Sequence, residues 1–206
     1  MLPSRFVLSG LILYVVLELI GSLLLQYTTF FHHKDQWVII GLRLSELAGL
    51  VYLVNHFRLI ESLGLSRPTI AQIQFFIVAS LACLTIAGLL YLVQPAWFVY
   101  VRLPEWLDGV SGFILMVCLA PVVEEMIFRG LLYRMLREQW GIWVSVTVSA
   151  VFFSLLHHGM VISPQFVGGI IFALAYEWSR SLWVSIGLHM GANGAVYILS
   201  VLALQT

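Results

Sequence analysis

The chain has 206 residues, of which 61% are hydrophobic and 10% are charged, and its formal net charge is zero. A soluble domain is nearer to half apolar and a quarter charged, so this composition excludes an ordinary soluble domain and predicts a protein that crosses the membrane several times. The neutral balance of charge gives no sign of a nucleic-acid partner.

Seven apolar segments have the composition of helical spans, each of which needs about 20 mostly apolar residues. The first is expected to be a retained span and not a signal peptide, because it contains Glu18 and lacks a convincing cleavage site. We expect seven spans, with six to eight as the range, at Phe6–Tyr27, Gln36–Phe57, Ile73–Val93, Val110–Leu132, Ile142–His157, Gln165–Trp178 and Leu182–Leu204. Long apolar runs without strand-like alternation predict an all-α bundle in a single domain over residues 1–206.

The connecting segments predict the orientation in the membrane. The segment from Leu59 to Gln72 is polar, and the aromatic segment from Gln94 to Asp108 predicts a stretch at headgroup depth. One side would carry six arginines and the other two basic residues: Arg5, Arg58, Arg67, Arg134, Arg137 and Arg180 against Lys34 and Arg102. The positive-inside rule therefore predicts a cytoplasmic N-terminus.

Several polar residues outside the C-terminal half have a structural interpretation. Arg43 and Glu46 lie one turn apart, and a polar contact between helices accounts for them, whereas Glu18 has no evident partner. The cluster His32, His33 and Lys34 is expected to be solvated and not to bind metal. Cys83 and Cys118 lie in apolar spans and are expected to be small core residues instead of a disulfide.

The segment from Pro121 to Gly130 places Glu124, Glu125 and Arg129 in, or at the edge of, an apolar span. Charged side chains are costly in hydrocarbon, so they face a polar interior and mark functional sites. Glu125 and Arg129 have the spacing of an ion pair, which a helix end that reaches water would explain. That explanation does not account for Glu124. A functional role is therefore favoured for Glu124.

Two further polar pairs lie on later spans. Phe153 and His157 are one helical turn apart, and His189 and Asn193 share one face of a glycine-rich segment. Each pair alone could be an interfacial histidine or a hydrogen-bonded contact between helices. Together with Glu124 they supply a general base, imidazoles that bind metal or hold water, and an amide donor for an oxyanion. This set predicts hydrolysis of an amide bond at a buried site.

At these residues the chain resembles the CAAX-protease and bacteriocin-processing family (also called CPBP or Abi) of intramembrane endopeptidases. Three family motifs occur in the family's order on separate spans: Glu-Glu-x-x-x-Arg from Glu124, Phe-x-x-x-His from Phe153, and His-x-x-x-Asn from His189. The resemblance covers the C-terminal half, from about Gly109 to Asn193.

The resemblance implies an intramembrane endopeptidase in which Glu124 activates water and His157 positions it. His189 and Asn193 would stabilise the oxyanion. The supporting residues would be Glu125, Arg129 and Phe153. The family has been described as metal-dependent and as glutamate-dependent; we expect a metal-free mechanism, with Zn²⁺ held by Glu124, His157 and His189 as the alternative.

The implied substrate is a membrane-attached peptide or protein in contact with the lipid bilayer. Prenylated C-termini, peptide precursors and anchored surface proteins are the family's substrate classes. The small size and short loops predict the plasma membrane of a prokaryote.

A geometric conflict arises if Val110–Leu132 and Ile142–His157 form a simple hairpin. Glu124 then lies nearer the cytoplasmic end and His157 nearer the outer end. At about 1.5 Å per residue their depths differ by more than a catalytic contact allows. A shared site requires the first helix to tilt or to extend through Arg137, or the second helix to start later.

Other classes of protein fit parts of the sequence. Gly109-Val110-Ser111-Gly112 has the Gly-x-Ser-Gly form of rhomboid-like serine intramembrane proteases, with Ser111 as nucleophile and His189 as base. Intramembrane Glu, His and Arg also occur in proton-coupled transporters, although no internal repeat supports this. A non-catalytic membrane protein is the third alternative. The His-Glu-x-x-His motif of site-two metalloproteases is absent.

Overall fold

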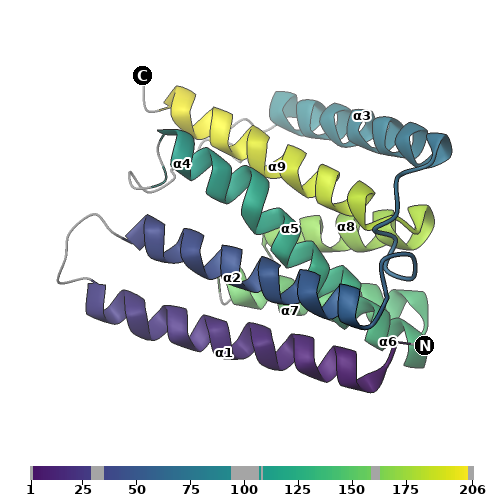
Figure 1. Cartoon of the computed structure of the whole chain (residues 1–206). Helices are drawn as coiled ribbons and strands as arrows, with labels where there is room; N and C mark the ends of the chain where they lie inside the picture. Colours follow the sequence, from purple (N-terminus) through teal and green to yellow (C-terminus); the bar gives the residue numbers. More distant parts are fainter. Residues whose placement is uncertain (1, 29–34, 94–106, 108, 159–162, 204–206) are drawn as a thin grey trace.

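The computed structural model describes residues 2–28, 35–93, 107, 109–158 and 163–203. This part of the chain is a bundle of helices without strands (Figure 1): α1 (Ser4–Thr28), α2 (Asp35–His56), α3 (Ile70–Val93), a long helix (Gly109–Gln139), α7 (Ile142–His158), α8 (Pro164–Ser179) and α9 (Leu182–Ala203). Six of the seven predicted spans agree with these helices to within three residues at each end. Helices satisfy their own backbone hydrogen bonds, as hydrocarbon requires.

Five of the helices are long and apolar enough to cross a membrane: Ser4–Leu25, Trp37–His56, Ile70–Val93, Gly109–Gln139 and Leu182–Val201. The helix Ile142–His157 is apolar but shorter. The predicted fold class, a polytopic helical membrane bundle, is therefore confirmed. Cys83 and Cys118 are free cysteines, but both are partly exposed, so the prediction that they are core residues was wrong.

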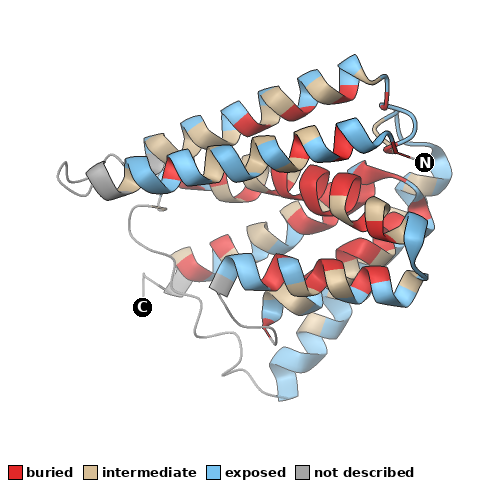
Figure 2. Ribbon diagram, turned by 90° about the horizontal axis from the view of Figure 1, so that it is seen from below, coloured by how far each residue is buried: buried red, intermediate tan, exposed pale blue. Residues whose placement is uncertain are grey.

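The long helix is the centre of the bundle. It runs through α4 (Gly109–Phe113), the π-helical segment η3 (Ile114–Leu119), α5 (Ala120–Glu125), the π-helical segment η4 (Met126–Tyr133) and α6 (Arg134–Gln139). Seven of the eight residues of η4 are buried, and Figure 2 shows the buried residues concentrated along this helix. By contrast, none of the residues of α3 is buried, so its apolar surface suits contact with lipid.

One hydrophobic core joins this central helix to the others. The core includes Phe6 of α1, Leu50 of α2, Val123 of α5, Phe153 of α7 and Ile186 of α9. A core that is shared from the first helix to the last supports the single domain predicted for residues 1–206, which stays a prediction.

The length of the central helix removes the conflict in depth. The predicted span ended at Leu132, which was wrong, because the helix continues to Gln139. Glu124 lies 15 residues before Gln139, and His157 lies 15 residues after Ile142, where the next helix begins. At about 1.5 Å per residue, both side chains lie at similar distances from the turn that joins the two helices. The extension through Arg137, one of the expected alternatives, therefore brings Glu124 and His157 to the same depth.

The six arginines of the predicted cytoplasmic side lie at one end of the bundle. α1 begins there, the α2–α3 connection and the α8–α9 turn lie there, and α6 ends there (Figure 1). The backbone N–H of Leu2 donates to Glu138 Oε1 of α6 at 2.7 Å. The two basic residues of the other side, Lys34 and Arg102, lie outside the described residues, as do His32, His33 and most of the predicted headgroup segment.

The α2–α3 connection was predicted to be polar, but it packs against the α8–α9 turn. Leu63 is only 2% exposed. The carbonyls of Leu63 and Gly64 accept hydrogen bonds from the Tyr176 hydroxyl (3.2 Å) and the Leu182 N–H (3.0 Å). Gly64 has φ +71°, and a Cβ atom there would lie 2.3 Å from the carbonyl oxygen of Arg180. This connection therefore depends on a glycine at position 64.

We expect Gly64→Ala to lower stability by about 2 kcal/mol or more, because a side chain is disfavoured in this left-handed conformation and also meets backbone. Gly41→Ala is the matched control. Gly41 lies in α2 with nothing within 4 Å of its Cβ direction, so the alanine should be neutral or slightly stabilising in a helix. Thermal unfolding of both variants in detergent tests the prediction, and equal midpoints would contradict it.

Candidate active site

The side chains of the two adjacent glutamates of the central helix lie in different environments. Glu125 is completely buried and accepts three hydrogen bonds, from Arg129 Nη1 (2.9 Å), Ser185 Oγ (2.6 Å) and His189 Nδ1 (2.8 Å). The predicted Glu125–Arg129 ion pair is thus confirmed. Its predicted place, a helix end in water, is wrong, because both side chains are 0% exposed in the middle of the helix.

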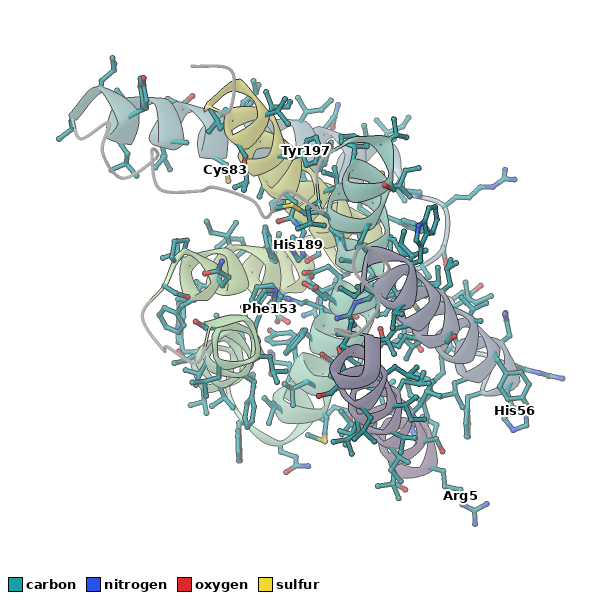
Figure 3. All side chains as sticks on the ribbon, turned by 90° about the vertical axis from the view of Figure 1, so that its left-hand side faces the viewer. Arg5, His56, Cys83, Phe153, His189 and Tyr197 are labelled. Carbon is teal, nitrogen blue, oxygen red and sulfur yellow. The ribbon has the colours of Figure 1, made fainter. Side chains whose placement is uncertain are left out.

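Arg129 is held between aromatic rings. Its guanidinium lies 4.8 Å from the ring centre of Phe153 and 5.5 Å from that of Phe172, and Nη2 donates to the Gly169 carbonyl at 2.9 Å. Phe153 also contacts the His157 ring, with 4.5 Å between ring centres. Figure 3 shows Phe153 and His189 in the middle of the bundle, whereas Arg5 and His56 point outward. Phe153 therefore links the ion pair to the histidine one turn later.

Glu124 faces the two histidines. Its Oε2 atom lies 3.5 Å from His157 Nε2 and 3.8 Å from His189 Nε2. The same oxygen is buried and, among the residues that the structure describes, has no hydrogen-bond partner. Helices α5, α7 and α9 thus bring together three of the four predicted catalytic residues.

Hydrogen bonds on the far side of each imidazole determine which nitrogen carries the proton. His189 Nδ1 is bonded to the Glu125 carboxylate, and His157 Nδ1 is bonded to the Phe153 carbonyl at 2.8 Å. Both partners are acceptors, so each Nδ1 must be the donor. Each neutral imidazole then presents the lone pair of Nε2 toward Glu124. Two lone pairs and a carboxylate oxygen converge, and the two O–H groups of a water molecule could donate to the carboxylate oxygen and to one of the imidazoles.

Asn193, the fourth predicted catalytic residue, lies one turn beyond His189 on α9. Its amide Nδ2 donates to the Met116 carbonyl of η3 at 2.9 Å. This bond is the contact between helices that the sequence also allowed. The oxyanion role of Asn193 stays a prediction.

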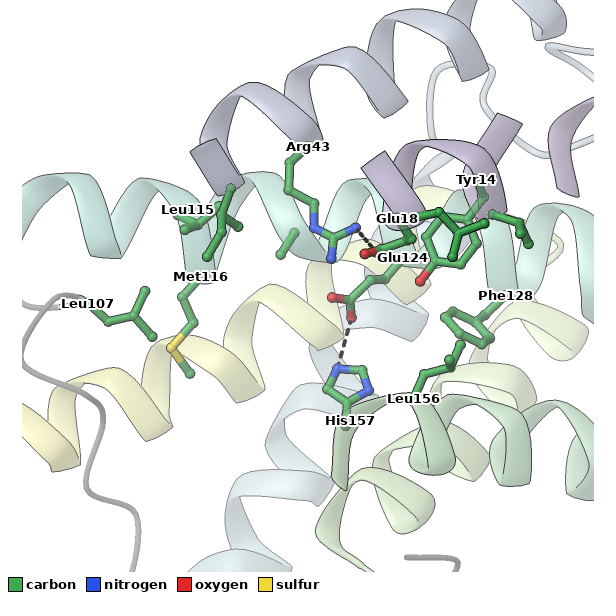
Figure 4. A pocket seen from close by; sticks show the side chains of 14 residues that line it. Tyr14, Glu18, Arg43, Leu107, Leu115, Met116, Glu124, Phe128, Leu156 and His157 are labelled. Atoms are coloured by element: carbon green, nitrogen blue, oxygen red, sulfur yellow. Dashed lines mark hydrogen bonds and ion pairs between the residues drawn. The ribbon is translucent and has the colours of Figure 1, made fainter. Parts of the chain in front are cut away.

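Glu124 and His157 line a cavity of about 730 Å³ between α1, α2, the central helix and α7 (Figure 4). Three polar residues of its wall were not predicted to belong to the site: Tyr14 and Glu18 of α1 and Arg43 of α2. For Glu18 and Arg43 the signal in the sequence was charge inside apolar spans, which marks functional positions. Tyr14 carried no such signal. Arg43 does make a polar contact between helices, but with Glu18 of α1, for which no partner was predicted. Its contact with Glu46 lies within α2.

A zinc site would need three or four suitable ligand atoms in a tetrahedral arrangement. Among the described residues, no group of three or more His, Cys, Asp or Glu side chains is arranged to hold a metal ion. Glu124, His157 and His189 supply suitable atoms, but their present arrangement is not that of a metal site.

The serine alternative has less support from the geometry. Ser111 lies 13 residues before Glu124 on the central helix, which is about 20 Å at 1.5 Å per residue. Its expected base, His189, contacts Glu124 and Glu125 instead. The neighbouring glycines have structural explanations, since Gly109 has φ +80° and a Cβ atom on Gly112 would overlap the Leu107 carbonyl.

The part of the chain that carries these residues is similar to a known protein family. Residues 105–195 match the family described as type II CAAX prenyl endopeptidase Rce1-like. The match covers less than half of the chain and shows that this part is similar to the Rce1-like family. All three motifs, from Glu124 to Asn193, lie within the Rce1-like segment, and the resemblance found from the motifs is thereby confirmed.

Two relatives match about the same share of the chain. The membrane-embedded CAAX protease MroQ of Staphylococcus aureus (strain USA300) is 35% identical over 91 residues, which are 41% of this chain and 37% of MroQ. YdiL of Bacillus subtilis (strain 168), described as a candidate membrane peptidase, is 27% identical over 103 residues, 46% of this chain and 41% of YdiL. The matched regions thus span less than half the length of either relative. No solved structure matches the chain significantly.

Proposed function

We propose that this protein is an intramembrane endopeptidase that hydrolyses a peptide bond with water activated by Glu124. The observation that carries the proposal is the buried Glu124 oxygen, which has no hydrogen-bond partner among the described residues and faces two imidazole nitrogens at the wall of a cavity. The match of residues 105–195 to the Rce1-like family model supports the same chemistry.

In the proposed reaction, a water molecule donates one hydrogen bond to Glu124 Oε2 and the other to a histidine Nε2. Glu124 removes a proton as the water oxygen attacks the carbonyl carbon, and the electrons of the carbonyl double bond move to its oxygen. When the tetrahedral intermediate collapses, the C–N bond breaks and Glu124 returns the proton to the leaving amine. Glu124 therefore acts first as general base and then as general acid.

The remaining site residues hold this arrangement. Glu125, supported by Arg129, fixes the tautomer of His189, and Phe153 does the same for His157 through its carbonyl. Asn193 has a second amide N–H for the oxyanion beside the one bonded to Met116. His189 donates to the oxyanion from Nε2 only when its ring is doubly protonated.

The proposed substrate is a peptide or protein attached to the membrane, which reaches the cavity from the surrounding lipid. MroQ is named a CAAX protease, and both relatives come from bacteria. We place the protein in the plasma membrane of a prokaryote, with its N-terminus and the arginine-rich end in the cytoplasm.

The test compares purified wild type with Glu124→Ala on a panel of membrane-anchored peptides, with and without a strong chelator. The panel includes a prenylated C-terminus, and mass spectrometry identifies the products. We expect wild-type cleavage that survives the chelator and is lost in Glu124→Ala. Loss in the chelator would show that a metal takes part. Full activity of Glu124→Ala would contradict the proposal, and Ser111→Ala would then be the next variant.

A further inference from the structure

The cavity has a second charged wall, which lies outside the Rce1-like segment. Tyr14, Glu18 and Arg43 come from α1 and α2 and face Glu124 and His157 across the cavity. Figure 4 shows the Arg43 guanidinium and the His157 ring on opposite sides of the Glu124 carboxylate. A group bound beside Glu124 would therefore meet Arg43.

Two carboxylates fix the position of the Arg43 side chain through one of its guanidinium nitrogens. Nη1 donates to Glu18 Oε1 at 2.8 Å and to Glu46 Oε2 at 2.6 Å. A guanidinium has five N–H donors, and both protons of Nη1 are used in these bonds. Within the described residues Arg43 makes no ion pair with Glu124, and its Nε and Nη2 donors have no protein partner. The side chain is 16% exposed and lines the cavity, so these donors are available to a ligand.

The reaction needs such donors, because few others point into the site. The Nδ1 protons of both histidines are bonded to Glu125 and to the Phe153 carbonyl, and one amide proton of Asn193 is bonded to the Met116 carbonyl. A tetrahedral oxyanion is stabilised by N–H donors that are already in place before the reaction.

The charges of the cavity indicate which ligand atom Arg43 binds. Glu18 and Glu124 line the cavity with Arg43, and Glu46 is bonded to Arg43 outside the lining. The carboxylates outnumber the single arginine, so a free carboxylate of the substrate would be repelled. A neutral peptide carbonyl meets no such penalty. As Glu124 accepts the proton, its negative charge is transferred to the carbonyl oxygen, and the net charge beside Arg43 does not change.

We infer that Arg43 is a further catalytic residue, which donates from its free N–H groups to the carbonyl oxygen of the scissile bond. Glu18 and Glu46 are its positioning residues. This inference rests on the proposed function and adds to it a residue from α2, a helix that the family match does not include.

The competing explanation is structural: Arg43 would serve only to neutralise Glu46, which is 0% exposed. Two variants separate the explanations. Arg43→Met removes the guanidinium and leaves the carboxylates unpaired. The triple variant Glu18→Gln/Arg43→Met/Glu46→Met removes all three charges. Replacing a buried ion pair by apolar groups of similar volume is often neutral for stability.

The experiment measures kcat, KM and the thermal midpoint for both variants on a membrane-anchored peptide that the wild type cleaves. We expect Arg43→Met to lower kcat by about 10²–10³-fold, the usual loss for one oxyanion donor, with a smaller change in KM. The triple variant should recover the wild-type midpoint and keep the low kcat. A third variant, Arg43→Lys, should recover part of the wild-type kcat. A triple variant with kcat within about tenfold of wild type would overturn the inference.

Two further results keep the inference distinct from the proposed function. If Arg43→Met raises only KM, and only for peptides with a free C-terminal carboxylate, then Arg43 binds that carboxylate and the inference is overturned. Glu124→Gln is measured in parallel. If it is inactive while the triple variant is active, only the role of Arg43 fails, whereas full activity of Glu124→Gln removes the proposed function itself.

Discussion

Substitution of Glu124 by glutamine should lower kcat by about 10²–10⁴-fold, the contribution of a well-placed general base. The amide cannot accept the proton of the attacking water. The fold should be little affected, because Glu124 Oε2 has no hydrogen-bond partner in the described part of the chain and the side chain faces the cavity. The new amide would even supply a donor to the nearby histidine lone pairs. Steady-state cleavage of a membrane-anchored peptide and the thermal midpoint in detergent measure the two effects separately.

Glu61→Gln is the control for the loss of one carboxylate, since Glu61 is exposed in the α2–α3 connection. It should change neither activity nor midpoint. A Glu124→Gln variant that unfolds at a much lower temperature than wild type would show that Glu124 is structural, against the role proposed here.

Arg129→Met should destabilise the protein by about 3–5 kcal/mol, the usual cost of removing one partner of a buried ion pair. The loss leaves the carboxylate of Glu125, which is 0% exposed, without its cation. It also removes the donor to the Gly169 carbonyl. Activity should fall with stability, because Glu125 holds His189 in the orientation that faces Glu124. Unfolding of the purified protein in a titration with denaturing detergent measures the change.

Arg137→Met is the matched control, because it makes the same replacement of arginine by methionine at a more exposed ion pair. Arg137 is 34% exposed and pairs with Glu177 at 3.3 Å, while Glu177 keeps Arg180 and Tyr133 as partners. Its removal should cost about 1 kcal/mol or less. The double variant Glu125→Gln/Arg129→Met removes both buried charges and should recover part of the lost stability. Equal stabilities for Arg129→Met and Arg137→Met would show that the buried pair contributes no more than an exposed one.

Much of the fold was predictable because hydrocarbon leaves the backbone few choices. Apolar runs of about 20 residues must be helices, so the seven helices follow from composition and spacing alone. The central helix was the exception. Arg134 and Arg137 looked like the start of a loop, yet the helix continues to Gln139 beyond the apolar run. Helix formation does not stop where hydrophobicity stops, so hydropathy placed its end seven residues too early.

The site was predictable as a set of residues but not as an arrangement. The motifs identified Glu124, His157 and His189, whose proximity is now seen at 3.5 and 3.8 Å. Spacing also identified the Glu125–Arg129 pair, because residues four apart share a helix face. Spacing did not show that this pair is fully buried or that Ser185 completes the environment of Glu125.

The sequence by itself determined the helices, their order and the polar residues suited to hydrolysis, since each follows from local composition and from spacing along one helix. Only the tertiary structure decided which of two adjacent glutamates faces the cavity, because consecutive helical residues point about 100° apart and the neighbouring helices choose between them. It also decided that Glu18 and Arg43 share the cavity with Glu124. Lipid does not drive helices together by hydrophobicity, so the shape of the contacts and a few polar bonds between distant segments determine how they pack.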